Sequence, residues 1–433
     1  PPKVLALGFA GVILTGGLLL MLPFASASGE PTDFLTALFT ATSAVCVTGL
    51  VVVDTGTHYS LWGQIIIMIL IQTGGLSFMT MASFLFLLMG KRIGLRERIL
   101  IRESLNQVDV SGVVRLVRAV LIYAFSAEAV FAVVLTLRWL PDFGWPRALW
   151  FGVFHTVSAF NNAGFDLMGE FRSLTGYVND AIVVLTISCL FILGGIGFSV
   201  VLNLWEWRER RLTTHARLAI RVTAVLIAAG TAILLLLEWS NTLATLNDPG
   251  KLLGAYFTAT TPRTAGFNTL DTAGLRPATQ FLIVLLMFIG ASPGSTGGGI
   301  KTTTFGLLAA AVWSQGRGRE DVVILGRRIP VEQVNRAFVV TFVSGGLIVL
   351  VTLLLCLTEE AEFLTVLFET VSAFGTVGLS MGITPKLSAL GQGLIILTMY
   401  AGRVGPLTLV FALAQSRKPK NGVRHVDDKV LIG

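Results

Sequence analysis

The chain has 433 residues, of which 54% are hydrophobic and only 13% are charged, whereas a soluble domain carries roughly 25% charged residues. This composition excludes an ordinary soluble domain and predicts an integral membrane protein. The net charge of +7 comes from Lys and Arg clusters between apolar stretches, so it does not indicate nucleic-acid binding.

Eight apolar stretches recur along the chain, most of them near the length of about 20 residues that crosses roughly 30 Å of hydrocarbon. They cover residues 4–22, 61–89, 117–137, 178–204, 219–237, 279–289 with a glycine-rich extension, 337–357 and 390–414. We therefore expect an all-α protein with eight transmembrane helices.

Basic residues follow every second apolar stretch. They are Lys91, Arg92, Arg96, Arg98, Arg102, Arg208, Arg210, Arg211, Arg217, Arg317, Arg319, Arg327, Arg328, Arg417, Lys418, Lys420 and Arg424. The alternate loops are acidic, with Glu30, Asp33, Asp54, Asp142, Asp166, Glu170, Asp248, Asp271, Glu359, Glu360 and Glu362. The positive-inside rule then predicts a multi-pass protein of the plasma membrane, with both termini in the cytoplasm. The acidic outer face would attract cations.

Four short segments of the chain align on a shared glycine. They are FTATSAVCVTGL, FHTVSAFNNAGF, YFTATTPRTAGF and FETVSAFGTVGL, aligned on Gly49, Gly164, Gly266 and Gly378. Ten residues before each glycine stands an aromatic residue, and six residues before it stands Ser or Thr (Ser43, Ser158, Thr260 and Ser372). A match in one register, each time between two apolar stretches, indicates four copies of one unit.

Each unit has a helix too short to cross the bilayer, expected at residues 32–45, 147–160, 250–261 and 361–374. Non-helical backbone at membrane depth is tolerated where protein buries it or where it lines a watery cavity, so each segment reads as a re-entrant loop. A unit with two crossings starts on the same side each time. The repeats are then parallel, with pseudo-fourfold symmetry around one axis, which disfavours an inverted-repeat transporter. Their expected bounds are 1–90, 91–206, 207–313 and 314–414, followed by a cytoplasmic tail at 415–433.

The recurring glycine suits a cation filter. Rings of backbone carbonyls can replace the hydration shell of an ion, and glycine adopts the required backbone angles at little cost. A lone glycine here would be a helix C-cap, whereas four in register favour a filter. The expected filter residues are Val47, Thr48, Gly49, Asn162, Ala163, Gly164, Thr264, Ala265, Gly266, Thr376, Val377 and Gly378, with K+ held at their carbonyls. Because the side chains before the glycine differ between copies, carbonyls must supply the shared chemistry. The side chains of Asn161 and Asn162 are expected to brace the loop.

These segments resemble the membrane subunit of the Trk/Ktr/HKT superfamily of potassium transporters, and the Ktr type most of all. The resemblance covers residues 4–414 and is carried by VCVTGL, FNNAGF, PRTAGF, GTVGLS, GASPGSTGGGIKTTT and YAGRVGP. It implies K+ as the transported ion, with Na+ as a second candidate and no organic cofactor. Glycine rather than serine at position 49 implies preference for K+. The resemblance also implies a homodimer on a cytosolic nucleotide-binding ring of the KtrA/TrkA kind, contacted by 91–102, 205–217 and 417–433.

The sixth apolar stretch is interrupted by GASPGSTGGGIKTTT, residues 290–304, which we name the gate loop. Its glycines and Pro293 cannot sustain a helix, so either a kink or a flexible loop is expected. A phosphate-binding loop is disfavoured, because Ile300 separates Gly299 from Lys301. By resemblance, this loop obstructs the pore and moves to open it. The expected gate residues are Gly294, Gly297, Gly298, Gly299, Lys301 and Arg403.

Two arginines stand in apolar surroundings, where a charge is costly and usually functional. Arg403, in YAGRVGP, is expected to face the pore as a positive barrier below the filter; a structurally paired arginine is the alternative. Arg263 would repel the cation if it lined the path. We therefore expect it behind the filter, capping helix carbonyls or paired with an acid such as Glu369.

Two other transport classes remain open. One is a tetrameric-type potassium channel fused into one chain, which shares the filter. The other is a sodium-coupled solute symporter, which fourfold parallel repetition disfavours. An enzyme is not expected, because no triad, metal cluster or carboxylate pair converges. The four histidines are scattered, and His155 is expected to pack in a short helix.

Overall fold

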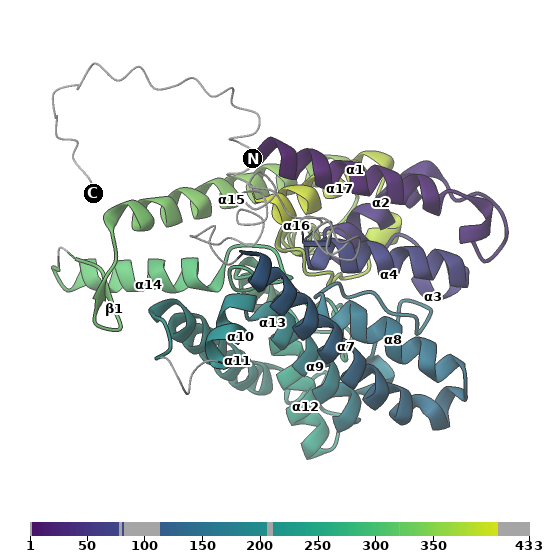
Figure 1. Ribbon diagram of the computed structural model, residues 1–433, viewed down its shortest axis with the longest axis horizontal. Coiled ribbons are helices and arrows are strands. Elements are labelled where there is room, and N and C mark those ends of the chain that lie inside the picture. Colours follow the sequence, from purple (N-terminus) through teal and green to yellow (C-terminus); the bar gives the residue numbers. More distant parts are fainter. Residues whose placement is uncertain (1, 78–79, 82–112, 206–210, 320, 406–433) are drawn as a thin grey trace.

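The computed structural model describes residues 2–77, 80–81, 113–205, 211–319 and 321–405, and the fold is mostly helical (Figure 1). We call the parts of the chain that correspond to the four predicted repeats its quarters. The first two quarters hold α1 (Pro2–Leu20), η1 (Pro23–Ala25), α2 (Phe34–Val45), α3 (Thr55–His58), α4 (Leu61–Gly75), α7 (Val113–Phe143), α8 (Arg147–Phe160), η2 (Thr175–Tyr177), α9 (Ala181–Gly195) and α10 (Phe198–Trp205). The last two hold α11 (Thr214–Glu238), α12 (Asp248–Thr260), α13 (Pro277–Phe288), α14 (Thr302–Gly316), β1 (Val323–Ile324), β2 (Arg327–Arg328), α15 (Val331–Thr358), α16 (Phe363–Gly375), η3 (Thr384–Lys386) and α17 (Ala389–Val404).

Each quarter begins with a long apolar helix. Within the described residues, four helices are long and apolar enough to cross a membrane, namely α1, α7, α11 and α15, and α9 with α10 makes a fifth if the bent pair counts as one span. The four long helices, α1, α7, α11 and α15, are the first helices of the four units predicted from the repeats. The remaining predicted spans, within 61–89, 279–289 and 390–414, contain the shorter apolar helices α4, α13 and α17.

A short helix follows each long one, close to the predicted positions. These helices, α2, α8, α12 and α16, have 12, 14, 13 and 13 residues, or about 18–21 Å of helix, too little to span a bilayer. Side chains cap the N-termini of two of these helices. The Asp33 carboxylate accepts a hydrogen bond from the main-chain amide of Leu35 at 3.0 Å, and the Asn247 side-chain oxygen accepts one from the main-chain amide of Gly250 at 2.8 Å.

Packing between quarters forms a closed cycle. Within a quarter the long helix packs on the short one: α1 on α2, α7 on α8, α11 on α12 and α15 on α16. Between quarters, the second helix of each contacts the short helix of the next: α4 meets α8, α9 meets α12, α13 meets α16, and α17 returns to α2. The short helices therefore lie toward the inside of this cycle. Their inward-facing residues are mostly buried.

The second helix of each quarter ends at a glycine-containing break. α4 ends at Gly75, and α9 bends by 98° into α10 across Ile196 and Gly197. α13 gives way to the gate loop, and α17 ends at Val404, followed by Gly405 with φ of 90°. The sequence predicted only the break in the sixth span. The break in the fourth was missed, because GGIG lies inside a stretch of continuous hydrophobicity.

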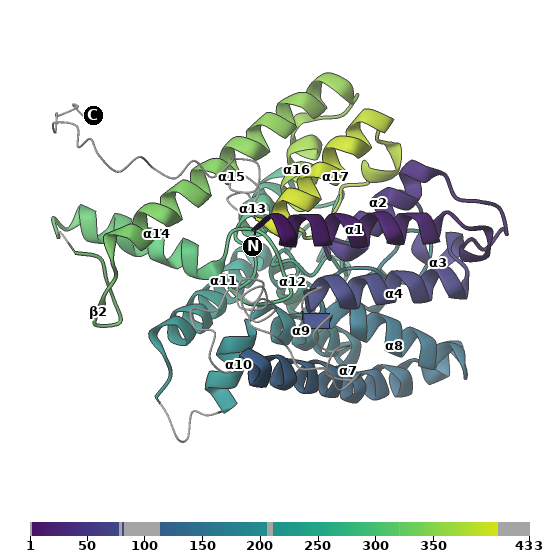
Figure 2. The ribbon, with the colours of Figure 1, turned by 45° about the horizontal axis from the view of Figure 1, so that its top comes forward.

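One part of the molecule projects beyond the helical cycle. α14, the hairpin of β1 and β2, and the start of α15 extend to one side of the molecule (Figures 1 and 2). The strands pair antiparallel, with Val323 opposite Arg328. Of the three predicted contact regions for a partner, 91–102 and 417–433 lie outside the described residues, as do residues 206–210 of the third.

Candidate functional site

The four predicted filter loops share one backbone conformation. Two residues before each glycine, a residue with a side chain takes positive φ: Val47 51°, Asn162 56°, Thr264 72° and Thr376 50°. The glycines themselves have φ of 91°, 70°, 80° and 95°, for Gly49, Gly164, Gly266 and Gly378. The residue between each pair does not have positive φ. Such alternation aligns successive peptide groups, whereas a strand points them in opposite directions.

The four glycines lie against one another in a closed ring. A Cβ built on Gly49 would lie 3.1 Å from the Cα of Gly164, and one on Gly164 would lie 2.9 Å from the Cα of Gly266. A Cβ on Gly266 would lie 3.4 Å from the Cα of Gly378, and one on Gly378 would lie 3.0 Å from the Cα of Gly49. Any side chain in this ring would meet the backbone of the next loop, so only glycine fits.

The short helices hold these loops from behind. The main-chain amides of Thr48, Ala163 and Val377 donate to the carbonyls of the serines five residues earlier, at 2.8, 2.8 and 2.9 Å. In the first and fourth loops the serine side chain also accepts from the glycine amide, Ser43 from Gly49 at 3.0 Å and Ser372 from Gly378 at 3.1 Å. The short helices end three to six residues before the glycines, so their partly negative C-terminal ends face the ring.

All twelve predicted filter residues lie in these four loops, and every one except the half-buried Gly378 is buried. His155 packs between rings, 5.0 Å from Trp139 and 6.5 Å from Phe267 measured between centroids. Its Nε2 accepts from the amide of Leu167 at 3.3 Å. It therefore braces a short helix, as predicted.

The gate loop enters the cycle directly below the filter loops. It is docked on the break between α9 and α10, where the amide of Ser292 donates to the Gly195 carbonyl at 3.0 Å and that of Phe198 donates to the Gly294 carbonyl at 2.8 Å. A Cβ on Gly297 would collide with the Thr264 hydroxyl, and a Cβ on Gly298 with the Thr376 hydroxyl. The helical part resumes at Thr302, so the last three residues of the predicted loop belong to α14.

Two cationic side chains donate hydrogen bonds to main-chain carbonyls of this loop. The Arg403 guanidinium donates to the Thr296 carbonyl in the loop and to the Gly74 and Gly75 carbonyls at the end of α4. The Lys301 ammonium donates to the Gly297 carbonyl at 2.7 Å. Within the part of the chain that the structure describes, neither forms an ion pair with a carboxylate. No carboxylate among the described residues therefore neutralises their positive charge, which acts on the space around them.

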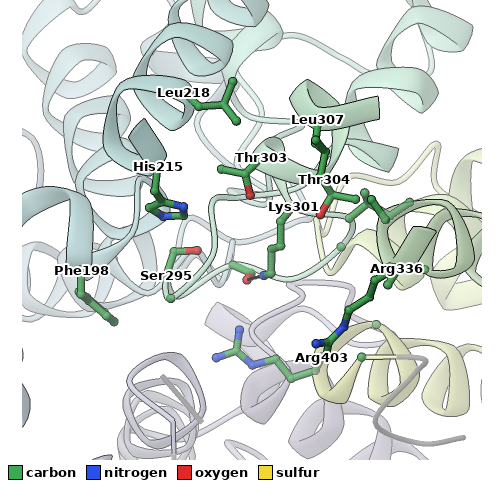
Figure 3. Close-up of a pocket in the computed structure, with 18 of the residues that line it drawn as sticks. Phe198, His215, Leu218, Ser295, Lys301, Thr303, Thr304, Leu307, Arg336 and Arg403 are labelled. Carbon is green, nitrogen blue, oxygen red and sulfur yellow. Dashed lines mark hydrogen bonds between the residues drawn. The ribbon is translucent and has the colours of Figure 1, made fainter. Parts of the chain in front are cut away.

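That space is a cavity of about 700 Å³ on the side of the gate loop away from the filter. Its wall includes Gly294, Gly297, Gly299, Lys301, Arg336 and Arg403 (Figure 3). Lys301, the loop residue directly before α14, and Arg403 of α17 reach toward the middle of the loop, with His215 on the opposite side. The described lining contains no Asp or Glu. A cation in this cavity would face positive side chains just below the loop.

Arg263 lies behind the third filter loop and donates to the Thr223 hydroxyl of α11 at 3.1 Å. Its placement away from the ring agrees with the sequence, but the suggested pairing with Glu369 is wrong. The Glu369 carboxylate accepts from the hydroxyls of Ser380 at 2.7 Å and Thr384 at 2.5 Å, and so stabilises the chain after the fourth filter loop instead.

A polar cluster behind the second filter loop was missed from the sequence. The Glu128 carboxylate of α7 accepts from the side-chain amide of Gln72 at 3.0 Å and from that of Asn161 at 3.2 Å. Asn161 also donates to the Gln72 side-chain oxygen at 2.7 Å. All three side chains are buried. The available signal was Glu128, the single acid in the apolar stretch 117–137.

Comparison with known proteins supplies the family. The profile of the TrkH family, described as cation transport protein, matches residues 11–421. The chain is 44% identical to the Ktr system potassium uptake protein B of Bacillus subtilis over 100% of this chain and 97% of that protein, and 41% identical to its namesake from Vibrio alginolyticus over 100% and 95%. It is 39% identical to the potassium/sodium uptake protein NtpJ of Enterococcus hirae over 100% and 97%.

A solved structure shares the fold. The potassium transporter TrkH from Vibrio parahaemolyticus superposes with a TM-score of 0.73 at 19% identity, over 94% of this chain and 83% of that one. The expectation of a transport protein rather than an enzyme is confirmed by the family and by these relatives. The predicted Trk/Ktr resemblance is confirmed as well. The chain belongs to the TrkH family of cation transport proteins.

Proposed function

We propose that this chain takes up K+ across the plasma membrane through a filter of backbone carbonyls from its four glycine loops. The observation that carries this proposal is the closed ring of Gly49, Gly164, Gly266 and Gly378, each with positive φ. Carbonyls around such a ring can take the place of the hydration shell of a cation. The names of the relatives at 44% and 41% identity, which are potassium uptake proteins, support K+ as the ion.

We further propose that the gate loop closes this path, with Arg403 and Lys301 as a positive barrier beneath the filter. The support is the position of Gly297 and Gly298 against the third and fourth filter loops. The loop fills the place an ion would enter on leaving the filter. The unpaired cations beside it oppose ion entry while the loop is closed.

The proposed architecture is eight crossings in four parallel repeats around a central pore. The cyclic packing of the second helices on the short helices of the next quarter supports it. We keep the repeat bounds 1–90, 91–206, 207–313 and 314–414 as part of this proposal. Charge distribution supports cytoplasmic termini, with the cavity of about 700 Å³ on the cytoplasmic side.

We propose that two copies assemble in the membrane on a cytosolic nucleotide-binding ring of the KtrA/TrkA kind. Two relatives are named as protein B of a Ktr system, which supports a multicomponent assembly. The name of the Enterococcus hirae relative, a potassium/sodium uptake protein, favours Na+ as a second cation for this chain. A simple channel or a sodium-coupled symporter are the alternatives that flux measurements separate.

The substitution Gly49→Ser tests the filter. A Cβ at this position would strike the Ala163 carbonyl, and φ of 91° is unfavourable for serine. We expect the K+/Na+ uptake ratio of the purified protein in liposomes to fall by about tenfold, the equivalent of roughly 1.4 kcal/mol of differential binding. Measurements with and without a Na+ gradient separate coupled from channel-like transport.

The matched control is Gly345→Ser in α15, where a Cβ meets no atom within 4 Å. We expect it to keep the uptake ratio of the parent protein. An identical K+/Na+ ratio in the parent and in a folded Gly49→Ser variant would remove Gly49 from the selectivity filter.

A further inference from the structure

The side chains two residues before the filter glycines differ, although the backbone there is the same in all four loops. They are Val47, Asn162, Thr264 and Thr376, and all are buried. A side chain that served the ion would be expected in every copy. Their differences therefore need another cause, which the contacts of these side chains provide.

The gate loop hydrogen-bonds to the second filter loop through side chains. The Thr296 hydroxyl donates to the Asn162 side-chain oxygen at 2.8 Å. The Asn162 side-chain amide in turn donates to the Thr264 hydroxyl of the third filter loop at 3.2 Å. A chain of two hydrogen bonds thus joins the gate loop to two filter loops, and all three side chains are at most 1% exposed.

The fourth filter loop has its own bond to the gate loop. The main-chain amide of Gly298 donates to the Thr376 hydroxyl at 3.1 Å. On the side of the first quarter, where Val47 has no polar group to offer, the Arg403 guanidinium joins the Thr296 carbonyl to the end of α4. The side chains at the four equivalent positions thus differ in the same way as their contacts with the gate loop, which is not symmetric.

We propose that Thr296, Asn162 and Thr376 are positioning residues that latch the gate loop to the underside of the filter. This inference rests on the proposed function for its effect on flux. Opening requires the bonds of Thr296 to Asn162 and of Gly298 to Thr376 to break together. Because these groups are buried, each broken bond leaves an unpaired donor or acceptor until water enters. The latch therefore favours the closed pore without touching the ion.

The test uses the full-length chain with Thr296→Val, which keeps the side-chain shape and removes the hydroxyl, and with Thr296→Ser, which keeps the hydroxyl. One net hydrogen bond shifts a two-state equilibrium about fivefold. We therefore expect Thr296→Val to raise basal K+ flux in liposomes about fivefold, at an unchanged K+/Na+ ratio. Thr296→Ser should behave like the parent.

Thr376→Val tests the second bond from the filter side. We expect a rise of about fivefold alone and of about twenty-fivefold together with Thr296→Val, since separate bonds add. Thr341→Val is the matched control, because its hydroxyl bonds only to the Ala337 carbonyl of its own helix at 2.9 Å. The control should leave flux unchanged.

Hydrogen–deuterium exchange of residues 290–304 provides a readout that does not depend on transport. Thr296→Val should raise exchange in this segment about fivefold, and Thr296→Ser should not. Unchanged exchange in a folded Thr296→Val protein would overturn the latch. So would a changed K+/Na+ ratio at unchanged flux, since the bond would then support the filter rather than the gate. If Thr296→Val raises exchange as expected but the parent protein carries no K+, the proposed function is rejected and the latch is not.

Discussion

The guanidinium of Arg403 joins the gate loop to the end of α4, two segments more than 200 residues apart in the chain. It also lies 6.0 Å from the ring centroid of Phe9 in α1. In the proposed function, one side chain thus combines a positive charge beside the proposed ion path with hydrogen bonds that hold the loop in place. These two roles can be separated by substitution.

Replacing Arg403 with Ala removes both roles, and we expect K+ flux in liposomes to rise about tenfold or more, because charged hydrogen bonds are worth roughly 1.5–3 kcal/mol each. Arg403→Lys keeps the charge but loses the fork that bridges the loop to α4. It should raise flux less than Ala does. Unchanged flux in the Ala variant would contradict both roles.

The sequence was informative about a residue that recurred or that was unusual for its surroundings. The meeting of the four glycines was predicted because four copies shared one register, and the place of Arg403 beside the gate loop because a charge in an apolar helix is costly. Glu128 is equally unusual, yet its partners Gln72 and Asn161 come from other helices and share no motif with it. The partner of Arg263 was wrong for the same reason. Side-chain pairing across helices follows from the packing of the fold, which repeats do not encode.

The short helices and the breaks are the elements that surround the four glycine loops. Their lengths were predictable from the repeats, whereas the tight packing at the breaks was not. A Cβ on Gly74, Gly194 or Gly402 would collide with carbonyls in the last turn of α2, α8 and α16, at Val45, Phe160 and Phe374. These glycines let the second helices touch the short helices.

The gate loop is the element whose removal is most informative. Deleting residues 294–299 removes every contact of Thr296, Gly297 and Gly298 with the filter loops while leaving those loops intact. We expect a protein that leaks K+ in liposomes at an unchanged K+/Na+ ratio. On either side of the deleted segment, the amide of Thr302 donates to the Ala291 carbonyl at 3.2 Å and the hydroxyls of Ser292 and Thr302 lie 2.8 Å apart, so α13 and α14 can stay joined. A deletion that conducts no more than the parent would argue against gating by this loop.

On the scale of the whole molecule, four quarters pack in a cycle, and the second helix of each quarter packs on the short helix of the next. The repeats predicted four parallel units around one axis, but they did not predict which helix of one quarter contacts the next. The gate loop breaks the equivalence of the quarters, since it comes from the third quarter alone and touches three filter loops differently. Which side chains it would meet could not be predicted, because the contacts join residues more than 70 positions apart.

The proposed filter depends on main-chain oxygens around the four glycines that hold the transported ion. The most direct measurement is anomalous X-ray diffraction from the full-length protein with Rb+ in place of K+. We predict an anomalous peak on the axis between Gly49, Gly164, Gly266 and Gly378, ringed by carbonyl oxygens of the filter loops, and weaker when Na+ competes. A peak elsewhere in the membrane region, with none between these glycines, would contradict it.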